Sequence, residues 1–320
     1  MRSGNSAGCG WHATFELRDF AAAIVLSWVP DQPLAALRAR WAPPPSAFID
    51  VGGLQVHYRD EGPRDDPMPL VLLHGTSASL HTWQGWAAAL RGAHRVVTFD
   101  LPGFGLTGPN ADGDYSDAAY VRTVLQMLDA LALPRIALGG NSLGGSIAWR
   151  TAVAAPQRIA ALILVDSAGY PLEPTSVPLG FRIASTPVLN RLAQNLLPRS
   201  VIAASVRSVY GHPERVTDDL IDCYMAMAAR AGNRRALAQI IANRSWSADA
   251  ASIATLRLPT LVLWGGRDRL IPPHQAQRFG HDIAGSQVVV FDDLGHVPHE
   301  EDPQRTVAEV QRFLATTSAR

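Results

Sequence analysis

The stretch Gly140-Asn-Ser-Leu-Gly144 limits the fold of this chain most, because the residues on its two sides have different patterns. Arg135–Leu138 before it has the pattern of a short apolar strand, and Leu143–Ala154 after it has the pattern of a helix. A serine with small residues two positions before and after it fits a sharp strand-to-helix turn that lifts its hydroxyl clear of a sheet. The pattern therefore predicts that Ser142 is a nucleophile. A glycine-rich turn with an incidental serine is the alternative.

The rest of the chain alternates between short apolar runs and amphipathic stretches, after an initial hairpin signal at Gly52-Gly53. Such alternation predicts an α/β fold with a mostly parallel, doubly wound sheet of eight strands. The expected strands are Phe48–Val51, Leu54–Tyr58, Leu70–Leu73, Arg95–Phe99, Arg135–Leu138, Ala161–Val165, Thr260–Trp264 and Gln287–Phe291. The expected helices include Ser116–Leu131, with Ser116 as N-cap, Leu143–Ala154 and Pro303–Leu314.

One long interruption of this alternation predicts a separate unit. From residue 170 to 249 no strand pattern occurs, and Pro187–Leu197 and Thr217–Arg230 have helical patterns. We predict a core of residues 46–169 and 250–320, a helical cap of residues 170–249 and an N-terminal arm of residues 1–45. Because ligands of open α/β sheets bind beyond the carboxyl ends of the strands, the cap is expected to form a pocket wall. Tyr224, Met225 and Met227 could line an acyl pocket, although this spacing is also typical of a helix core.

A serine nucleophile needs a base and an acid that orients the base. His296 follows the last expected strand, so it should lie at the same sheet edge as Ser142. Asp268 follows the preceding strand and gives the chain order Ser, Asp, His; Asp166 is the alternative acid. His299 and Glu300 near His296 do not complete a metal site, and no metal is expected.

The segment after Leu70–Leu73 is predicted to bind the oxyanion. A loop at this position supplies one backbone N–H, here that of Thr76, to pair with the N–H of Leu143, and the Thr76 hydroxyl is a candidate third donor. His74 is expected to be a structural hydrogen-bonding residue beneath the loop, and Asp100 a turn residue.

The composition excludes several classes of function. The 28 basic residues, all arginine, balance 28 acidic residues, so no electrostatic footprint for nucleic acid is present. The absence of lysine excludes a Schiff-base lysine and a phosphate-binding loop that ends in Gly-Lys-Ser/Thr. Two cysteines, Cys9 and Cys223, cannot build a disulfide framework, which favours a reducing compartment. No cofactor is expected.

The arm contains an apolar run, Phe20–Val29, that is too short to span a membrane and is preceded by acidic residues, unlike a secretory signal. We predict a cytoplasmic protein. Whether this run packs on the body, docks on a second copy, or lies on a membrane surface together with Leu34–Trp41 stays open.

Taken together, His74-Gly75, Asp100–Gly105, Gly140–Gly144, Gly265–Asp268 and Gly295-His296 resemble the α/β-hydrolase family. The loop His74–Trp83 is similar to that of bacterial carboxylesterases and lipases, including membrane-associated phospholipases, which implies hydrolysis of a small-molecule or lipid ester. Haloalkane dehalogenases and epoxide hydrolases use an aspartate in place of Ser142. A C–C bond hydrolase or perhydrolase with the same triad is an alternative, and a non-catalytic binding protein on this fold is a third.

Overall fold

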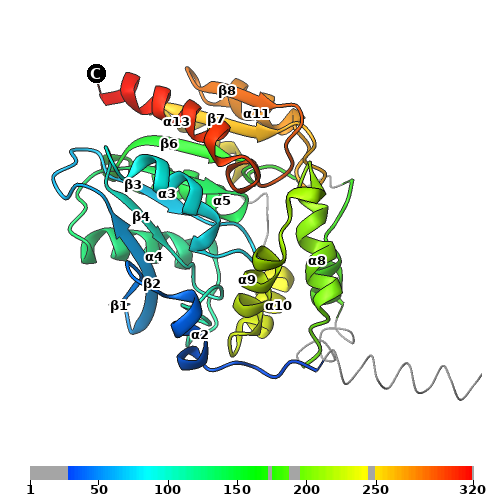
Figure 1. Ribbon diagram of the computed structural model, residues 1–320. Coiled ribbons are helices and arrows are strands. Elements are labelled where there is room, and N and C mark those ends of the chain that lie inside the picture. Colours follow the sequence, from blue (N-terminus) through cyan, green and yellow to red (C-terminus); the bar gives the residue numbers. More distant parts are fainter. Residues whose placement is uncertain (1–27, 172–174, 187–194, 244–248, 319–320) are drawn as a thin grey trace, which may run out of the picture.

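The computed structural model describes residues 28–171, 175–186, 195–243 and 249–318. Its centre is a sheet of eight strands in the order β1-β2-β4-β3-β5-β6-β7-β8 (Figure 1). β1 pairs antiparallel with β2, and β2 pairs antiparallel with β4. All the remaining pairs are parallel. The predicted mostly parallel eight-stranded sheet is confirmed. The strands are β1 (Ala47–Val51), β2 (Leu54–Glu61), β3 (Leu70–Leu73), β4 (Val96–Phe99), β5 (Ile136–Asn141), β6 (Ile159–Val165), β7 (Thr260–Gly265) and β8 (Gln287–Phe291).

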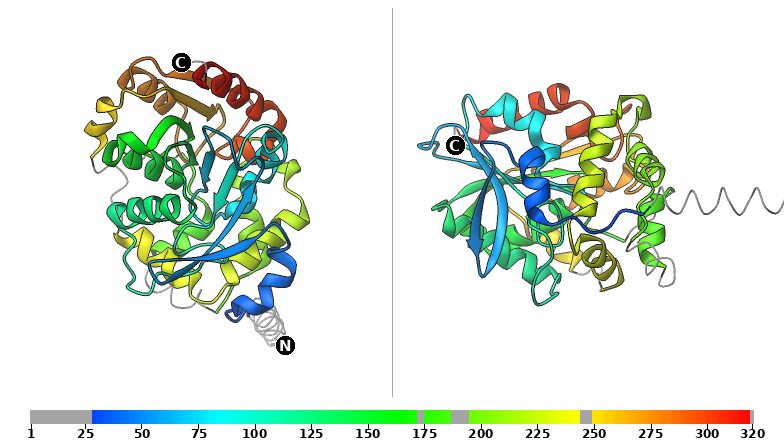
Figure 2. Two further views of the ribbon diagram at one scale, coloured as in Figure 1. Left: turned by 90° about the vertical axis from the view of Figure 1, so that its left-hand side faces the viewer. Right: turned by 60° about the horizontal axis from the view of Figure 1, so that its bottom comes forward.

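Helices cover both faces of the sheet, as the near-continuous burial of its central strands requires. On one face, α4 (Asp117–Ala130), α5 (Leu143–Ala154) and α11 (His274–Asp282) share a core around Trp149 and Trp264. On the other, α3 (Gln84–Leu90) and α13 (Pro303–Ser318) pack around Trp83 and Trp86. In the left view of Figure 2, α4 and α5 (green) and α13 (red) lie on opposite sides of the strands. Ser116 caps α4 as predicted, because its side chain accepts the N–H of Ala119.

The chain between β6 and β7 forms a group of helices at one end of the sheet (Figure 1). It includes α6 (Leu179–Ser185), α8 (Arg199–Ser208), α9 (Asp218–Ala229) and α10 (Asn233–Asn243), and among the described residues of this stretch no strand occurs. We propose that this group is the cap predicted at residues 170–249, and we keep the core and arm boundaries as proposals. Short connections are η1 (Leu80–Trp83), η2 (Pro156–Arg158), η3 (Pro213–Arg215), η4 (Ala250–Thr255) and α12 (Pro298–Glu301).

The described part of the arm lies against the cap. Gln32 donates its N–H to Ala229 and accepts the N–H of Ala231, and it is followed by α2 (Leu34–Trp41). Leu37 of α2 is buried in a cluster with Leu106 and Met227. Most of the predicted apolar run, residues 20–27, and most of the predicted helix Pro187–Leu197, residues 187–194, lie outside the described residues. No helix in the described ranges is long and apolar enough to cross a bilayer.

β5 and β2 each extend three residues further at their carboxyl ends than the sequence predicts. β5 continues through Gly139 and Gly140 to Asn141, because both glycines pair with β3 and β6 on either side. A Cβ at Gly139 would lie 2.7 Å from the side chain of Leu72. Glycine at this position therefore allows β5 and β3 to pack closely, in addition to any role in the turn. β2 continues to Glu61, where Asp60 forms ion pairs that include Arg95.

Candidate active site

Ser142 lies at the turn between β5 and α5, as the motif predicts. Its φ is 53° and its ψ is −113°, a strained conformation for a residue with a side chain. The turn is closed by close backbone contacts: a Cβ on Gly144 would lie 2.1 Å from the carbonyl oxygen of Leu73, and one on Gly140 would lie 2.3 Å from that of Gly144. The two glycines of the motif are therefore a steric requirement of this turn.

His296 and Asp268 are brought together from loops after β8 and β7. The Nδ1 of His296 donates to Oδ2 of Asp268 at 2.6 Å, and neither residue is more than 5% exposed. The other oxygen, Oδ1, accepts the N–H groups of Leu270 and Ile271. The carboxylate is thus fixed by three donors, and it defines the tautomer of the imidazole that leaves Nε2 free to accept a proton.

Ser142 and His296 line the same cavity. Among the hydrogen bonds of the described residues none joins Ser142 Oγ to His296 Nε2. Catalytic hydrogen bonds are often long without substrate and tighten only in the substrate complex. The backbone carbonyl of His296 accepts Nδ2 of Asn141, the residue before the serine, so the serine turn and the histidine loop are tied directly.

The loop after β3 lies directly against the serine. A Cβ on Gly75 would meet Oδ1 of Asn141 at 2.6 Å and Cβ of Ser142 at 3.3 Å. No hydrogen bond among the described residues uses the N–H of Thr76 or of Leu143, and Oγ1 of Thr76 is buried without a partner. We infer that these three groups remain free to donate to an oxyanion formed at Ser142.

Buried polar groups hold this loop from below. His74 donates from Nδ1 to the carbonyl of Gly75 at 2.7 Å and accepts the N–H of Leu101 at Nε2, which confirms the predicted structural role. Burial lowers the pKa of His74, so the ring is neutral at pH 7.

Asp100 does more than the predicted turn role. It is fully buried, accepts the N–H groups of Leu80 and Leu106, and pairs with Nδ1 of His57 at 2.7 Å. Although burial alone would raise the pKa of Asp100, the facing histidines, His57 first, lower it below its ordinary value. The Asp100 carboxylate therefore holds η1 and the loop after β4 against β2 through these hydrogen bonds. The role of His57 could not be predicted from the sequence, because no short motif links it to Asp100, 43 residues further along the chain.

Asp166, the alternative acid, follows β6 and is fully buried, but it is not bonded to His296. Its Oδ1 accepts the N–H of Gly265 at 3.0 Å. The hydrogen bond of the imidazole goes to Asp268 instead.

His299 and Glu300 lie on the side of η1 and the cap. The His299 ring stacks on Trp83 with centroids 4.1 Å apart, and its Nε2 bonds to Oγ1 of Thr82. Glu300 accepts the hydroxyls of Tyr210 and Tyr224. His299 is thus held within the core, whereas Glu300 joins the core to the cap.

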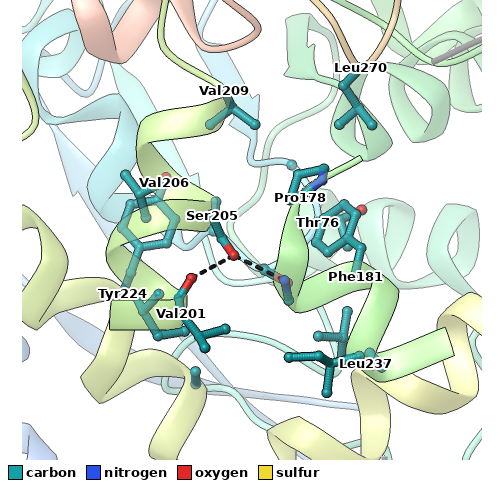
Figure 3. Close-up of a pocket in the computed structure, with 18 of the residues that line it drawn as sticks. Thr76, Pro178, Phe181, Val201, Ser205, Val206, Val209, Tyr224, Leu237 and Leu270 are labelled. Atoms are coloured by element: carbon teal, nitrogen blue, oxygen red, sulfur yellow. Dashed lines mark hydrogen bonds between the residues drawn. The ribbon is translucent and has the colours of Figure 1, made fainter. Parts of the chain in front are cut away.

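An apolar cavity opens over Ser142, between the core and cap helices α6, α8, α9 and α10 (Figure 3). The empty volume of the cavity, including the open space at its mouth, is about 1190 Å³. The hydroxyl of Ser205 is satisfied by other protein groups, because it accepts the N–H of Gly180 and donates to the carbonyl of Val201 (Figure 3). The apolar side chains labelled in the figure are Pro178, Phe181, Val201, Val206, Val209, Leu237 and Leu270.

The sequence did not identify most of these cavity residues. Tyr224 lines the cavity as considered, whereas Met227 packs with Leu37 and Leu106. Neither α6 nor α8 was among the helices predicted for this stretch, and which of their apolar residues face the cavity depends on how the helices pack.

Comparison with known proteins places the chain in a family. The family model for the α/β-hydrolase fold matches residues 68–303. The chain belongs to the α/β-hydrolase family. Lipase 1 of Psychrobacter immobilis is 29% identical to this family member over 262 residues, covering 78% of each chain. The 2-hydroxymuconate semialdehyde hydrolase of Pseudomonas putida is 28% identical, covering 85% of this chain and 94% of its own.

Solved structures show the same fold. A bacterial membrane phospholipase A, described as a virulence factor, superimposes with a TM-score of 0.72 at 24% identity, covering 96% of this chain and 93% of its own. The resemblance to this family inferred from the motifs is confirmed. Relatives of this α/β-hydrolase include both lipases and hydrolases of other substrates.

Proposed function

We propose that this family member is a carboxylic ester hydrolase that works through an acyl-enzyme on Ser142. The observation that carries the proposal is the apolar cavity, which ends at Ser142 and His296 and whose Ser205 hydroxyl is already satisfied. Such walls fit a hydrocarbon acyl chain, because most of the lining side chains are apolar and gain free energy as they exclude water. Arg234 is the charged residue of the lining, and its Nε and Nη1 have no hydrogen-bond partner among the described residues.

In the proposed reaction, Oγ of Ser142 attacks the ester carbonyl while its proton passes to Nε2 of His296. The N–H groups of Thr76 and Leu143, with the Thr76 hydroxyl, hold the oxyanion, and Asp268 stabilises the imidazolium through Nδ1. The alcohol leaves with the proton from Nε2, and the acyl group stays on the serine. Water then attacks the acyl-enzyme, loses a proton to the same nitrogen and releases the acid and the free serine.

Substitution of the nucleophile tests the proposal. Ser142→Ala should abolish hydrolysis of p-nitrophenyl esters while the circular dichroism spectrum and Tm stay close to those of the wild type. Ser146→Ala, one helical turn further along α5, is the matched control and should retain activity. Hydrolysis retained in Ser142→Ala would refute the serine mechanism.

A second candidate is a C–C bond hydrolase with the same triad, which the similarity to the 2-hydroxymuconate semialdehyde hydrolase favours. Assays with ring-fission products, and with peroxide and acetate for a perhydrolase, distinguish it from an esterase. A protein inactive on all these substrates would favour a non-catalytic binding role. The hydrogen bond between His296 and Asp268 and the cavity at Ser142 argue against a non-catalytic role.

We also propose that the protein is cytoplasmic and meets its substrate at a membrane surface, as the name of the membrane phospholipase neighbour implies for that protein. Trp28, Val177 and Leu179 are exposed apolar side chains. Val177 and Leu179 flank Pro178, and Trp28 pairs with Leu196; both Pro178 and Leu196 line the cavity. Exposed apolar residues beside a cavity that holds acyl chains suit partial insertion into lipid.

Sedimentation with phosphatidylcholine vesicles tests this contact. The wild type should co-sediment, and Trp28→Asp with Leu179→Asp should not, whereas the surface control Val153→Asp should behave as wild type. Binding unaffected by the paired substitutions would contradict the proposal. A concentration-dependent dimer that the same substitutions disrupt would assign this surface to a second copy instead.

A further inference from the structure

The carboxyl group of Asp166 is buried beside the proposed catalytic pair and has no role in the mechanism so far. Asp166 has a φ of 43°, in the left-handed region, and its side chain is fully buried. Oδ1 accepts the N–H of Gly265, but Oδ2 is buried without any donor among the described residues. An orphaned carboxylate oxygen is costly in such surroundings, so its protonation state needs an explanation.

The explanation lies in its neighbour Asp268. Asp166, Asp268 and His296 each present a ligand atom, and these atoms all lie within 4.8 Å of one another. No arginine forms an ion pair with either carboxyl group in the described part of the chain. Two buried carboxyl groups this close cannot both be ionised, so one must keep its proton.

The hydrogen bonds decide which group keeps the proton. Asp268 accepts three donors, the imidazole N–H and two backbone N–H groups, whereas Asp166 accepts one. Burial, and after it the charge of Asp268, raises the pKa of Asp166 well above its ordinary value, with a smaller contribution from Glu301. The backbone N–H of Gly265 opposes this shift only in part. Within the described part of the chain, the other titratable group that faces Asp166 is His296.

We propose that Asp166 is held as a neutral carboxylic acid whose O–H donates to the carboxylate of Asp268. This inference rests on the proposed triad. Asp166 is then a positioning residue: it gives Asp268 a fourth donor and acts on His296 only through it. The site carries one negative charge instead of two. A second charge would hold the proton on the imidazole and slow its transfer to the leaving alcohol.

The same three side chains are not arranged to ligate a metal. Zinc lies about 2.0 to 2.2 Å from nitrogen and carboxylate oxygen ligands, in tetrahedral geometry. Nδ1 of His296 and Oδ2 of Asp268 are 2.6 Å apart, which is too close for both to occupy separate corners of one tetrahedron and fits a shared proton.

Infrared spectroscopy tests the protonation state without using activity. In wild-type protein labelled with carboxyl-¹³C aspartate, we expect a carboxylic-acid C=O band that persists at pH 8, and Asp166→Asn should remove it. Absence of this band from the wild type would overturn the proposal even if Asp166→Asn failed to fold. Because this measurement needs no substrate, its result does not depend on whether the protein is an esterase.

The pH–rate profile is a second test of whether Asp166 is neutral. Asn is isosteric with the neutral acid and its amide donates to Asp268 in the same way, so Asp166→Asn should keep kcat/KM within about twofold and leave the acid limb unmoved. If Asp166 were ionised within 4.8 Å of the base, its removal would move that limb to lower pH by up to about two units. Such a shift would refute the neutral acid. Asp268→Asn, the contrasting variant, should lose about 10⁴-fold in kcat.

Discussion

The second glycine of the serine motif, Gly144, gives the sharpest structural prediction. In Gly144→Ala the new methyl group would lie 2.1 Å from the carbonyl oxygen of Leu73 and 2.7 Å from that of His74. Because an ordinary carbon–oxygen contact is about 3.3 Å, the turn and the end of β3 must separate by about 1 Å. Both contacts are to backbone atoms, so no side-chain rotation can relieve them.

That displacement acts on stability and on rate separately. Overpacking of this kind costs about 1 to 3 kcal/mol, which lowers Tm by about 1 to 5 °C in a domain of this size. A misplacement of about 1 Å between Ser142 and the oxyanion donors should cost about 100-fold in kcat/KM. We therefore expect Gly144→Ala to fold but to hydrolyse p-nitrophenyl esters far more slowly.

Gly92→Ala is the matched control, because no atom lies within 4 Å of its added methyl group and its φ is not positive. It should leave both Tm and kcat/KM unchanged. Wild-type activity in Gly144→Ala would refute the argument that the close backbone contacts position the serine, and an equal loss in Gly92→Ala would show that the effect is not local.

Two further predictions concern the cavity and pH. Val201→Trp should fill the cavity and lower kcat/KM for long-chain relative to short-chain esters by at least about tenfold. The control Val153→Trp, on the surface of α5, should leave this ratio unchanged. An unchanged chain-length profile in Val201→Trp would exclude Val201 from the acyl site. Burial lowers the pKa of His81 to about 4, so the unfolded chain binds a proton below about pH 6.5 that the folded protein does not. Stability should then fall on acidification from pH 6.5 to 4 by up to about 1.4 kcal/mol per pH unit for this group, and His81→Gln should reduce that slope in urea titrations. Parallel pH dependences would contradict this account of His81.

Much of the fold was predictable because it depends on short-range patterns. The strand, the serine turn and the helix around Ser142 follow from the spacing of small and apolar residues, and the chain order placed Asp268 and His296 at the same sheet edge. The strand ends were less predictable. The glycines of β5 have the pattern of a turn, and only the contact with Leu72 shows why the strand continues through them.

The buried polar pairs could not be predicted in the same way. Asp100 bonds to His57, and Asp166 lies against Asp268, across long separations in sequence. Neither pair has a characteristic spacing, since each depends on which strands become neighbours and how their loops return. The cavity walls are unpredictable for the same reason, because the orientation of α6 and α8 is set by their packing with α10 and α9.

Covalent labelling tests the central claim, that Ser142 is the nucleophile, most directly. The wild-type protein incubated with a fluorophosphonate should gain one adduct per chain by intact mass and lose esterase activity in step with labelling. Peptide mapping should place the adduct on Ser142, and Ser142→Ala should remain unlabelled. An adduct on another serine such as Ser77, or ester hydrolysis that survives complete labelling of Ser142, would contradict the account.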